Sequence, residues 1–160
     1  MLRKEPDLKL FLAVQEIFAP VFEEYGFELL PEEKQISYQT SVVAKKEDIE
    51  LVFRLESTYM FYLCSIGIKL TGELGKKVSS DPRYRELGAS VIAERLNPGY
   101  ESPVKEILTK SHLYRTLESD KAELLKYCKE ILLGDITPWQ AALKSILDEN
   151  KRSGFKLANY

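Results

Sequence analysis

The fold is decided by the stretch 49–66, which reads IELVFRLESTYMFYLCSI. Apolar and polar residues alternate on both sides of Ser57-Thr58, a pattern typical of two strands joined by a tight turn. A two-residue turn there would produce four apolar pairs on one face: Leu55 with Met60, Phe53 with Tyr62, Leu51 with Cys64 and Ile49 with Ile66. We therefore predict an antiparallel hairpin whose buried face is well specified, because a slip of one residue would turn these side chains outward.

The opposite face of this hairpin is the candidate functional surface. A preceding strand over Gln35–Ala44, turning at Lys45–Asp48, adds Val43 to it and puts Tyr38, Thr40, Val42 and Ala44 on the buried side. Helices from the second half could cover this face and give three layers. Alternatively the face is open and binds a partner, since an aromatic and apolar centre with an arginine and a polar rim is typical of interfaces. The residues expected to contact the partner are Val43, Glu50, Val52, Arg54, Glu56, Tyr59, Phe61 and Leu63.

An amphipathic helix is predicted before the sheet, over Asp7–Tyr25, with Gly26 as its stop and a kink near Ala19 because of Pro20. A short edge strand is expected over Phe27–Leu30. The predicted buried stripe of the helix consists of Leu8, Phe11, Leu12, Phe18, Val21, Phe22 and Tyr25.

The second half reads mainly as helices, so the fold class is α+β: a helix, a meander of three to four strands, and three to four C-terminal helices. The chain is expected to be one domain over residues 1–160, with a loosely held tail after Asn150. The predicted segments are a loop over Thr71–Ser80, a helix from Asp81 to Leu96, a short helix over Pro103–Lys110, a strand or loop over His112–Thr116, a helix over Asp120–Leu133, and a last helix opened by a capping box at Thr137–Gln140 that buries Trp139.

Composition narrows the class of protein. The 160 residues are 44% apolar, which excludes an intrinsically disordered chain. There are 23 basic against 25 acidic residues, and this net charge of −2 lacks the basic excess that is typical of nucleic-acid-binding proteins. The longest apolar run, Tyr59–Cys64, is too short to span a membrane. Cys64 and Cys128 lie among apolar residues, and reduced thiols fit better than a disulfide. We expect a cytoplasmic protein that binds neither nucleic acid nor membrane.

Few residues suggest catalysis. His112 is the only histidine, which removes metal sites built on paired imidazoles, and no metal, cofactor or catalytic residue is expected. The stretch Gly72–Lys77 follows a predicted strand, but its glycine spacing is too short for a phosphate loop and Glu73 would repel an anion. The neighbouring acids Glu23-Glu24, Glu32-Glu33 and Glu47-Asp48 are expected to be solvated. An enzyme or ligand-binding domain using the 72–77 loop is carried as an alternative.

The order of segments resembles a known class of proteins. A leading helix ending in Tyr25-Gly26-Phe27 is followed by a meander through Ile49–Phe53 and Met60–Ile66, and then by helices with Leu132-Leu133-Gly134-Asp135 and Trp139. This layout resembles small acidic bacterial α+β proteins of unknown function, among them immunity proteins of toxin systems, and more loosely the secretion chaperones. The resemblance implies a non-catalytic protein that masks or escorts another protein. A homo-oligomer formed through the same face is a further alternative.

Overall fold

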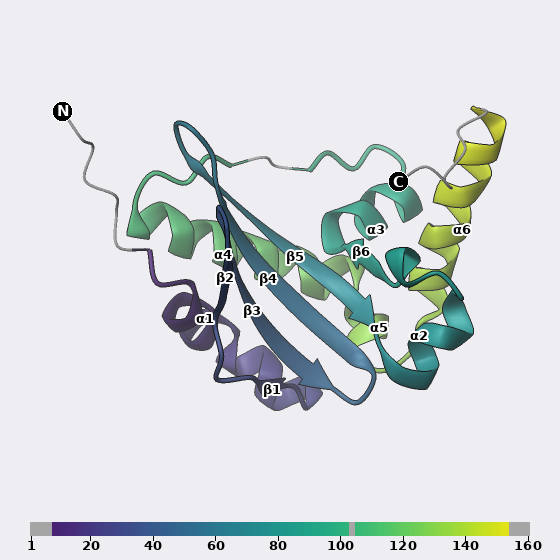
Figure 1. Cartoon of the computed structure of the whole chain (residues 1–160), viewed down its shortest axis with the longest axis horizontal. Helices are drawn as coiled ribbons and strands as arrows, with labels where there is room; N and C mark the ends of the chain where they lie inside the picture. The colour runs from purple at the N-terminus through teal and green to yellow at the C-terminus, as the bar shows by residue number, and fades with distance from the viewer. Residues whose placement is uncertain (1–7, 103–104, 154–160) are drawn as a thin grey trace.

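An antiparallel sheet of six strands organises the structure, a computed structural model that describes residues 8–102 and 105–153 (Figure 1). The α+β layout predicted from the sequence is confirmed. In chain order the elements are α1 (Leu10–Tyr25), β1 (Glu28–Leu29), β2 (Lys34–Ile36), β3 (Gln39–Lys46), β4 (Ile49–Ser57), β5 (Tyr62–Leu70), α2 (Gly72–Val78), the 3₁₀ helix η1 (Pro82–Tyr84), β6 (Glu86–Gly88), α3 (Ala89–Leu96), α4 (Lys110–Tyr127), α5 (Lys129–Leu132) and α6 (Thr137–Arg152).

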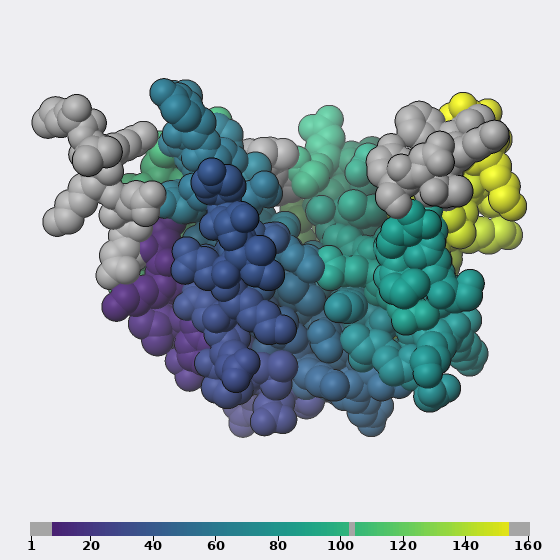
Figure 2. All heavy atoms as spheres, in the orientation of Figure 1, coloured from purple at the N-terminus to yellow at the C-terminus, as the bar shows by residue number. Residues whose placement is uncertain are grey.

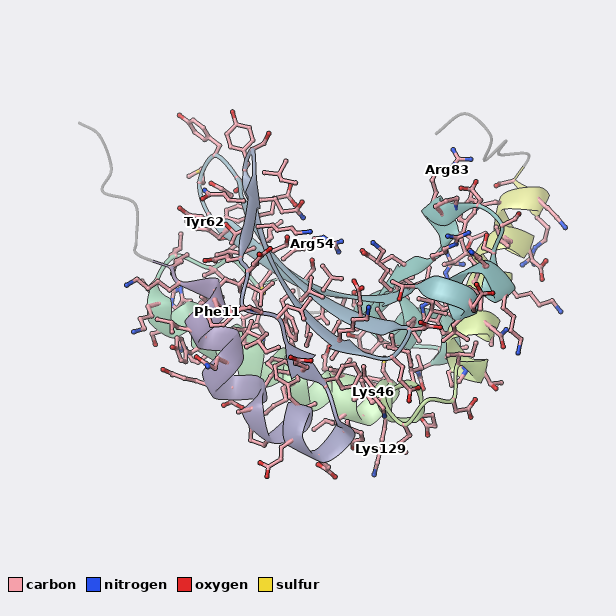
Figure 3. All side chains as sticks on the ribbon, turned by 60° about the horizontal axis from the view of Figure 1, so that its bottom comes forward. Phe11, Lys46, Arg54, Tyr62, Arg83 and Lys129 are labelled. Carbon is pink, nitrogen blue, oxygen red and sulfur yellow. The ribbon has the colours of Figure 1, made fainter. Side chains whose placement is uncertain are left out.

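One face of the sheet carries the hydrophobic core. The strand order is β1-β3-β4-β5-β6, with β2 also paired to β3, and helices α1 and α4 lie together on the core side (Figures 1 and 3). Phe53 of β4 is fully buried there, with its ring centroid 4.7 Å from that of Phe18 and 6.1 Å from that of Phe22. Edge-to-face aromatic contacts of this kind add to the stabilisation from burial alone. The predicted core face of the meander is therefore the observed one.

The predicted register between β4 and β5 is wrong by four residues. Leu55 pairs with Cys64 rather than Met60, and Phe53 pairs with Ile66. The connection is longer than two residues because Thr58 closes it: its backbone N–H and its hydroxyl both donate to the carbonyl of Phe61, at 2.8 and 2.6 Å. A shift of four is even, so the side chains that remain in β4 and β5 keep their predicted faces, whereas residues 59–61 leave the strand.

Helix α1 runs through Pro20 without a break. Pro20 is exposed, and the residues after it continue the buried stripe, so packing outweighs the hydrogen bond that proline removes. Gly26 ends the helix with φ of 79°, as expected. The stripe itself is rotated from the predicted one: Leu12 is exposed, and the buried residues are Leu10, Ala13, Val14, Ile17, Phe18, Val21, Phe22 and Tyr25.

The first strand of the predicted meander is two strands. A turn at Ser37-Tyr38 divides Gln35–Ala44, so that β2 folds back on β3. Ser37 adopts φ of 52°, a conformation usually signalled by glycine or asparagine, which explains why the sequence did not reveal the turn. Tyr38 consequently lies in this turn and not on the buried face, whereas Val42 and Ala44 are buried as predicted. The edge strand predicted over 27–30 is present as β1.

The segment after β5 contains structure where a loop and one long helix were predicted. Residues 72–78 form helix α2, and residues 81–88 form η1 and then β6, so that only 89–96 are helical in the predicted way. Asp81 does cap, as expected, but the cap belongs to η1, where its carboxylate accepts from the Arg83 N–H at 3.0 Å. The strand forms because β6 completes the sheet edge beside Gly67–Lys69 of β5.

The C-terminal helices also differ in their bounds. Helix α4 begins at Lys110, so His112–Thr116 is helical, and the described part of 103–110 is extended up to Thr109, with Ile107 bonded to Tyr62. Pro103 lies outside the described residues. The helix predicted over Asp120–Leu133 is interrupted at Cys128, which lies between α4 and α5. Helix α6 has no capping box: the carboxylate of Asp135 accepts from the Thr137 N–H at 3.0 Å instead.

Replacing Gly75 by alanine should destabilise the protein, although alanine is the better helix former. A Cβ at Gly75 would lie 2.6 Å from the carbonyl oxygen of Leu70, a backbone atom that cannot move away freely. We expect the free energy of unfolding, measured in urea, to fall by about 1–3 kcal/mol, the usual cost of overpacking. The exposed Lys76→Ala in the same helix is the control, and a gain in stability for Gly75→Ala would contradict the close packing of α2 on β5.

Candidate interaction surface

The face of the sheet opposite the core is not covered by α1 or α4. Atoms of strands β2–β4 form much of the surface turned to the viewer in Figure 2, and Arg54 projects from the side opposite α1 and α4 in Figure 3. Pairing places Glu56 beside Leu63, Val43 beside Val52, and Glu50 between Lys45 and Lys69 on this face. Apart from Val52 and Gly67, the side of β3–β5 that carries these residues is exposed or half-exposed.

An ion pair covers the middle of this face. Arg54 donates to both carboxylate oxygens of Glu86, at 2.5 and 2.7 Å, and so ties β4 to β6 across β5. The position between them on β5 is Gly67, and a Cβ there would lie within 2.9 Å of both side chains. Glycine therefore makes room for a bidentate pair, which is the strong geometry for arginine and carboxylate. Arg54 was predicted to face a partner, but in this structure it is engaged within the chain.

Tyr59 and Phe61 do not lie on the sheet face where the sequence placed them. With the register shifted by four, both fall in the 58–61 connection, and Ser65 and Leu63 take the places opposite Arg54 and Glu56. The apolar part of the face is thus reduced to Val43, Val52 and Leu63. Of the eight predicted contact residues, six share the face: Val43, Glu50, Val52, Arg54, Glu56 and Leu63.

The exposed aromatic residues gather at one end of the sheet instead. The turn between β2 and β3 lies beside the turn between β4 and β5, because the Ser57 N–H donates to the Tyr38 carbonyl at 2.8 Å. Four large apolar side chains on these two turns are exposed, and we call them the tip patch: Ile36 (70%), Tyr38 (77%), Tyr59 (101%) and Met60 (63%).

Three members of the tip patch were missed by the sequence. Ile36 and Tyr38 were assigned to a continuous strand, and Met60 was assigned to the buried face opposite Leu55. The available signal was the density of apolar residues in 59–63, which is unusual for a turn. As long as the pairing of β4 with β5 was unknown, this run of apolar residues indicated a strand rather than an exposed turn.

The other sequence candidates do not form a site. The 72–77 stretch is helical rather than a phosphate loop, and its Lys76 lies 3.4 Å from the Glu73 carboxylate. His112 is half-buried at the start of α4, where its backbone N–H donates to Thr109. Cys64 and Cys128 are free thiols, and burial raises the pKa of each to about 12, so neither is a reactive thiolate.

Within residues 8–102 and 105–153, no group of three or more metal-ligating side chains comes together. Helices in that part of the chain are also too short or too polar to cross a membrane.

Comparison of the chain with protein-family models, with curated proteins and with solved structures found no match.

One carboxyl away from the tip patch has an unusual environment. Asp120 of α4 is half-buried beside β5, and this burial raises the pKa of its carboxyl to about 7, with the charge of Glu123 acting in the same direction and Lys105 opposing. No local pattern around Asp120 indicates this burial, since acidic residues on a helix are normally solvated.

Asp120→Asn should stabilise the protein at pH 8 and leave it unchanged near pH 4. Because the folded pKa is raised above the unfolded value, the stability contributed by neutral Asp120 is lost as pH rises towards 7. Asparagine stays neutral, so the difference in unfolding free energy should grow to about 1–2 kcal/mol, allowing for partial solvent exposure. Urea unfolding of both proteins at several pH values measures this, and a difference independent of pH would contradict it.

Proposed function

We propose that this chain is a non-catalytic protein that binds and masks a partner protein through the tip patch and the adjoining sheet face. The observation that supports this is the exposure of Ile36, Tyr38, Tyr59 and Met60 together on two adjoining turns. Isolated exposed apolar residues are normal on protein surfaces, but a contiguous group marks an interaction site.

The chemistry of the tip patch fits a protein partner. Two tyrosines supply large contact area and a polar hydroxyl each, and tyrosine is enriched among the residues that dominate binding energy. The turn that carries Tyr59 and Met60 is held by the hydrogen bonds of Thr58, so little ordering is needed on binding. The patch is bordered on the sheet by Gln39 and Glu56, which are opposite each other and provide a polar rim.

Masking of a toxin is the most concrete form of this proposal. An immunity protein acts by covering a surface that its toxin needs, which requires a preformed apolar patch with polar groups that exclude wrong partners. Escort of a secreted protein, as by a chaperone, would use the same patch. Under either form we expect the protein in the cytoplasm, where its two free thiols stay reduced.

The test is retrieval of a partner by the tagged full chain from its host, read by mass spectrometry, followed by purification of the complex. A single partner present at equal amounts, together with protection of cells that express that partner, would support the proposal. A chain that stays monomeric by light scattering and retrieves no stoichiometric partner would contradict it. A dimer of this chain disrupted by changes in the tip patch would favour the homo-oligomer instead.

A further inference from the structure

The sulfur atoms of this chain differ in their access to solvent. In the described part of the chain sulfur occurs in Met60, Cys64 and Cys128, and Met1 lies outside that part. Met60 is 63% exposed in the tip patch, whereas Cys128 is fully buried and its thiol donates to the Ala89 carbonyl at 3.9 Å. A small oxidant dissolved in water therefore reaches the Met60 thioether directly.

Thiols and thioethers need different conditions to react with a peroxide. A thiol attacks a peroxide as its thiolate, and burial raises the pKa of Cys64 and of Cys128 to about 12. Both thiols consequently stay protonated at neutral pH. The thioether of Met60 has no proton to lose, so its reactivity depends on exposure and not on pH.

The turn that carries Met60 keeps this side chain on the surface. The hydroxyl of Thr58 donates to the Phe61 carbonyl at 2.6 Å and accepts from the Phe61 N–H at 3.2 Å. These bonds hold residues 58–61 out of the sheet, so that Met60 lies next to the exposed Tyr59 and not in the core. A change of polarity at Met60 therefore falls within the tip patch.

We propose that Met60 is an oxidation site, which a peroxide converts to methionine sulfoxide and which thereby makes the tip patch polar. In this step the sulfur lone pair attacks one peroxide oxygen, the O–O bond breaks, and that oxygen stays on sulfur. The thioether loses two electrons, and hydrogen peroxide is reduced to water. The sulfoxide oxygen is a hydrogen-bond acceptor, which is costly to bury in an interface without a donor.

The effect on a partner protein rests on the proposed function, whereas the reactivity of Met60 does not. An interface centred on the tip patch would lose affinity when Met60 is oxidised. Methionine sulfoxide reductases return the sulfoxide to the thioether, so the loss is reversible. Binding through the tip patch would thus respond to peroxide and recover after it is removed.

The first experiment treats the full chain with hydrogen peroxide and follows the addition of oxygen by mass spectrometry of tryptic peptides. Cleavage after Arg54 and Lys69 puts Met60 and Cys64 in one peptide, where fragmentation separates them, and Met1 in another. We expect Met60 to react within about threefold of the rate of N-acetyl-methionine methylamide, equally at pH 6 and pH 8, with Cys64 unmodified. A rate below about a tenth of that of the model compound, or oxidation of Cys64 before Met60, would overturn the proposal.

Retention of the native chain on a phenyl column measures the polarity of the patch without a partner. We expect the oxidised chain to elute earlier, and treatment with methionine sulfoxide reductases to restore the original retention. Met60→Leu is the matched control, because leucine has a similar volume and no sulfur, and its retention should not respond to peroxide. Unchanged retention after complete oxidation of Met60, or an equal change in Met60→Leu, would contradict the inference.

Isothermal titration with the purified partner separates this inference from the proposed function. Oxidation of Met60 should weaken the affinity about tenfold, and Met60→Leu should keep its affinity after the same treatment. Full affinity of the oxidised chain, together with loss of binding when Tyr38 and Tyr59 are exchanged for aspartate, would overturn the inference and support the proposed function. Absence of any partner would contradict the proposed function, while the peptide and column measurements still decide the inference.

Discussion

Exchanging Tyr38 and Tyr59 together for aspartate is expected to weaken the partner's affinity by more than about 100-fold. Tyrosines at the centre of an interface commonly contribute 2 kcal/mol or more each, and a carboxylate buried without a counter-ion adds a further penalty. Both side chains are largely exposed in the free chain, so the unfolding free energy should change by less than about 0.5 kcal/mol. Isothermal titration with the purified partner measures the first quantity and urea unfolding the second.

The matched control for this experiment is Leu133→Asp. Leu133 lies between α5 and α6 and is 63% exposed. It belongs to neither the tip patch nor the sheet face, so its substitution should leave the affinity unchanged. Phe61, which the sequence placed on the sheet face, is half-buried in the 58–61 turn, and a change there would mix loss of binding with loss of stability. Full affinity in the double tyrosine variant would remove the tip patch from the interface.

Trp139→Ala should produce the largest loss of stability among the substitutions considered, about 3–5 kcal/mol. Trp139 is fully buried, and its indole N–H donates to the carbonyl of Ile68 at 3.1 Å, so it fastens α6 to β5. Alanine would leave a cavity in the core and also remove the indole hydrogen bond to the Ile68 carbonyl. Because Trp139 is the only tryptophan, unfolding must be followed by circular dichroism rather than fluorescence.

Trp139→Phe separates the two contributions. Phenylalanine fills most of the volume but cannot donate, so we expect a smaller loss, about 1–3 kcal/mol, which includes the loss of the indole hydrogen bond to the Ile68 carbonyl. Leu133→Ala, on the exposed side of the same region, should change stability by less than about 0.5 kcal/mol. If Trp139→Ala lowered the unfolding free energy less than Trp139→Phe, the packing of Trp139 against β5 would not be what holds α6 in place.

Local sequence signals located the helix ends better than the turns. Gly26 was predicted to end the first helix, and it takes a positive φ, which glycine adopts at little cost. The turn at Lys45–Asp48 was predicted correctly although Glu47 takes a positive φ, whereas the β2–β3 turn, where Ser37 takes a positive φ, has no glycine or asparagine to signal it. This is why the first predicted strand was not divided and Tyr38 was misplaced.

In the candidate site too, some features could be predicted from local sequence patterns and others could not. The face of Val43, Val52 and Leu63 followed from alternation, since that pattern needs only the period of a strand. The tip patch did not, because its existence depends on which residues leave the sheet. A pocket beside Asp120 is lined by four separate segments of the chain, so no local pattern in the sequence indicates it.

The sequence by itself determined which side chains of the meander face the core, because alternation has a period of two and any even shift preserves it. The register followed only from the folded structure, in which local hydrogen bonds of Thr58 to Phe61 close a longer turn and the long-range bonds between Tyr62 and Ile107 fix the end of β5. The folded structure also decided that residues 86–88 are a strand, since they pair with the outer edge of β5 rather than satisfying their backbone locally. The longer turn, held by Thr58 and followed by a strand end fixed at Ile107, places Tyr59 at the exposed tip and not on the sheet face.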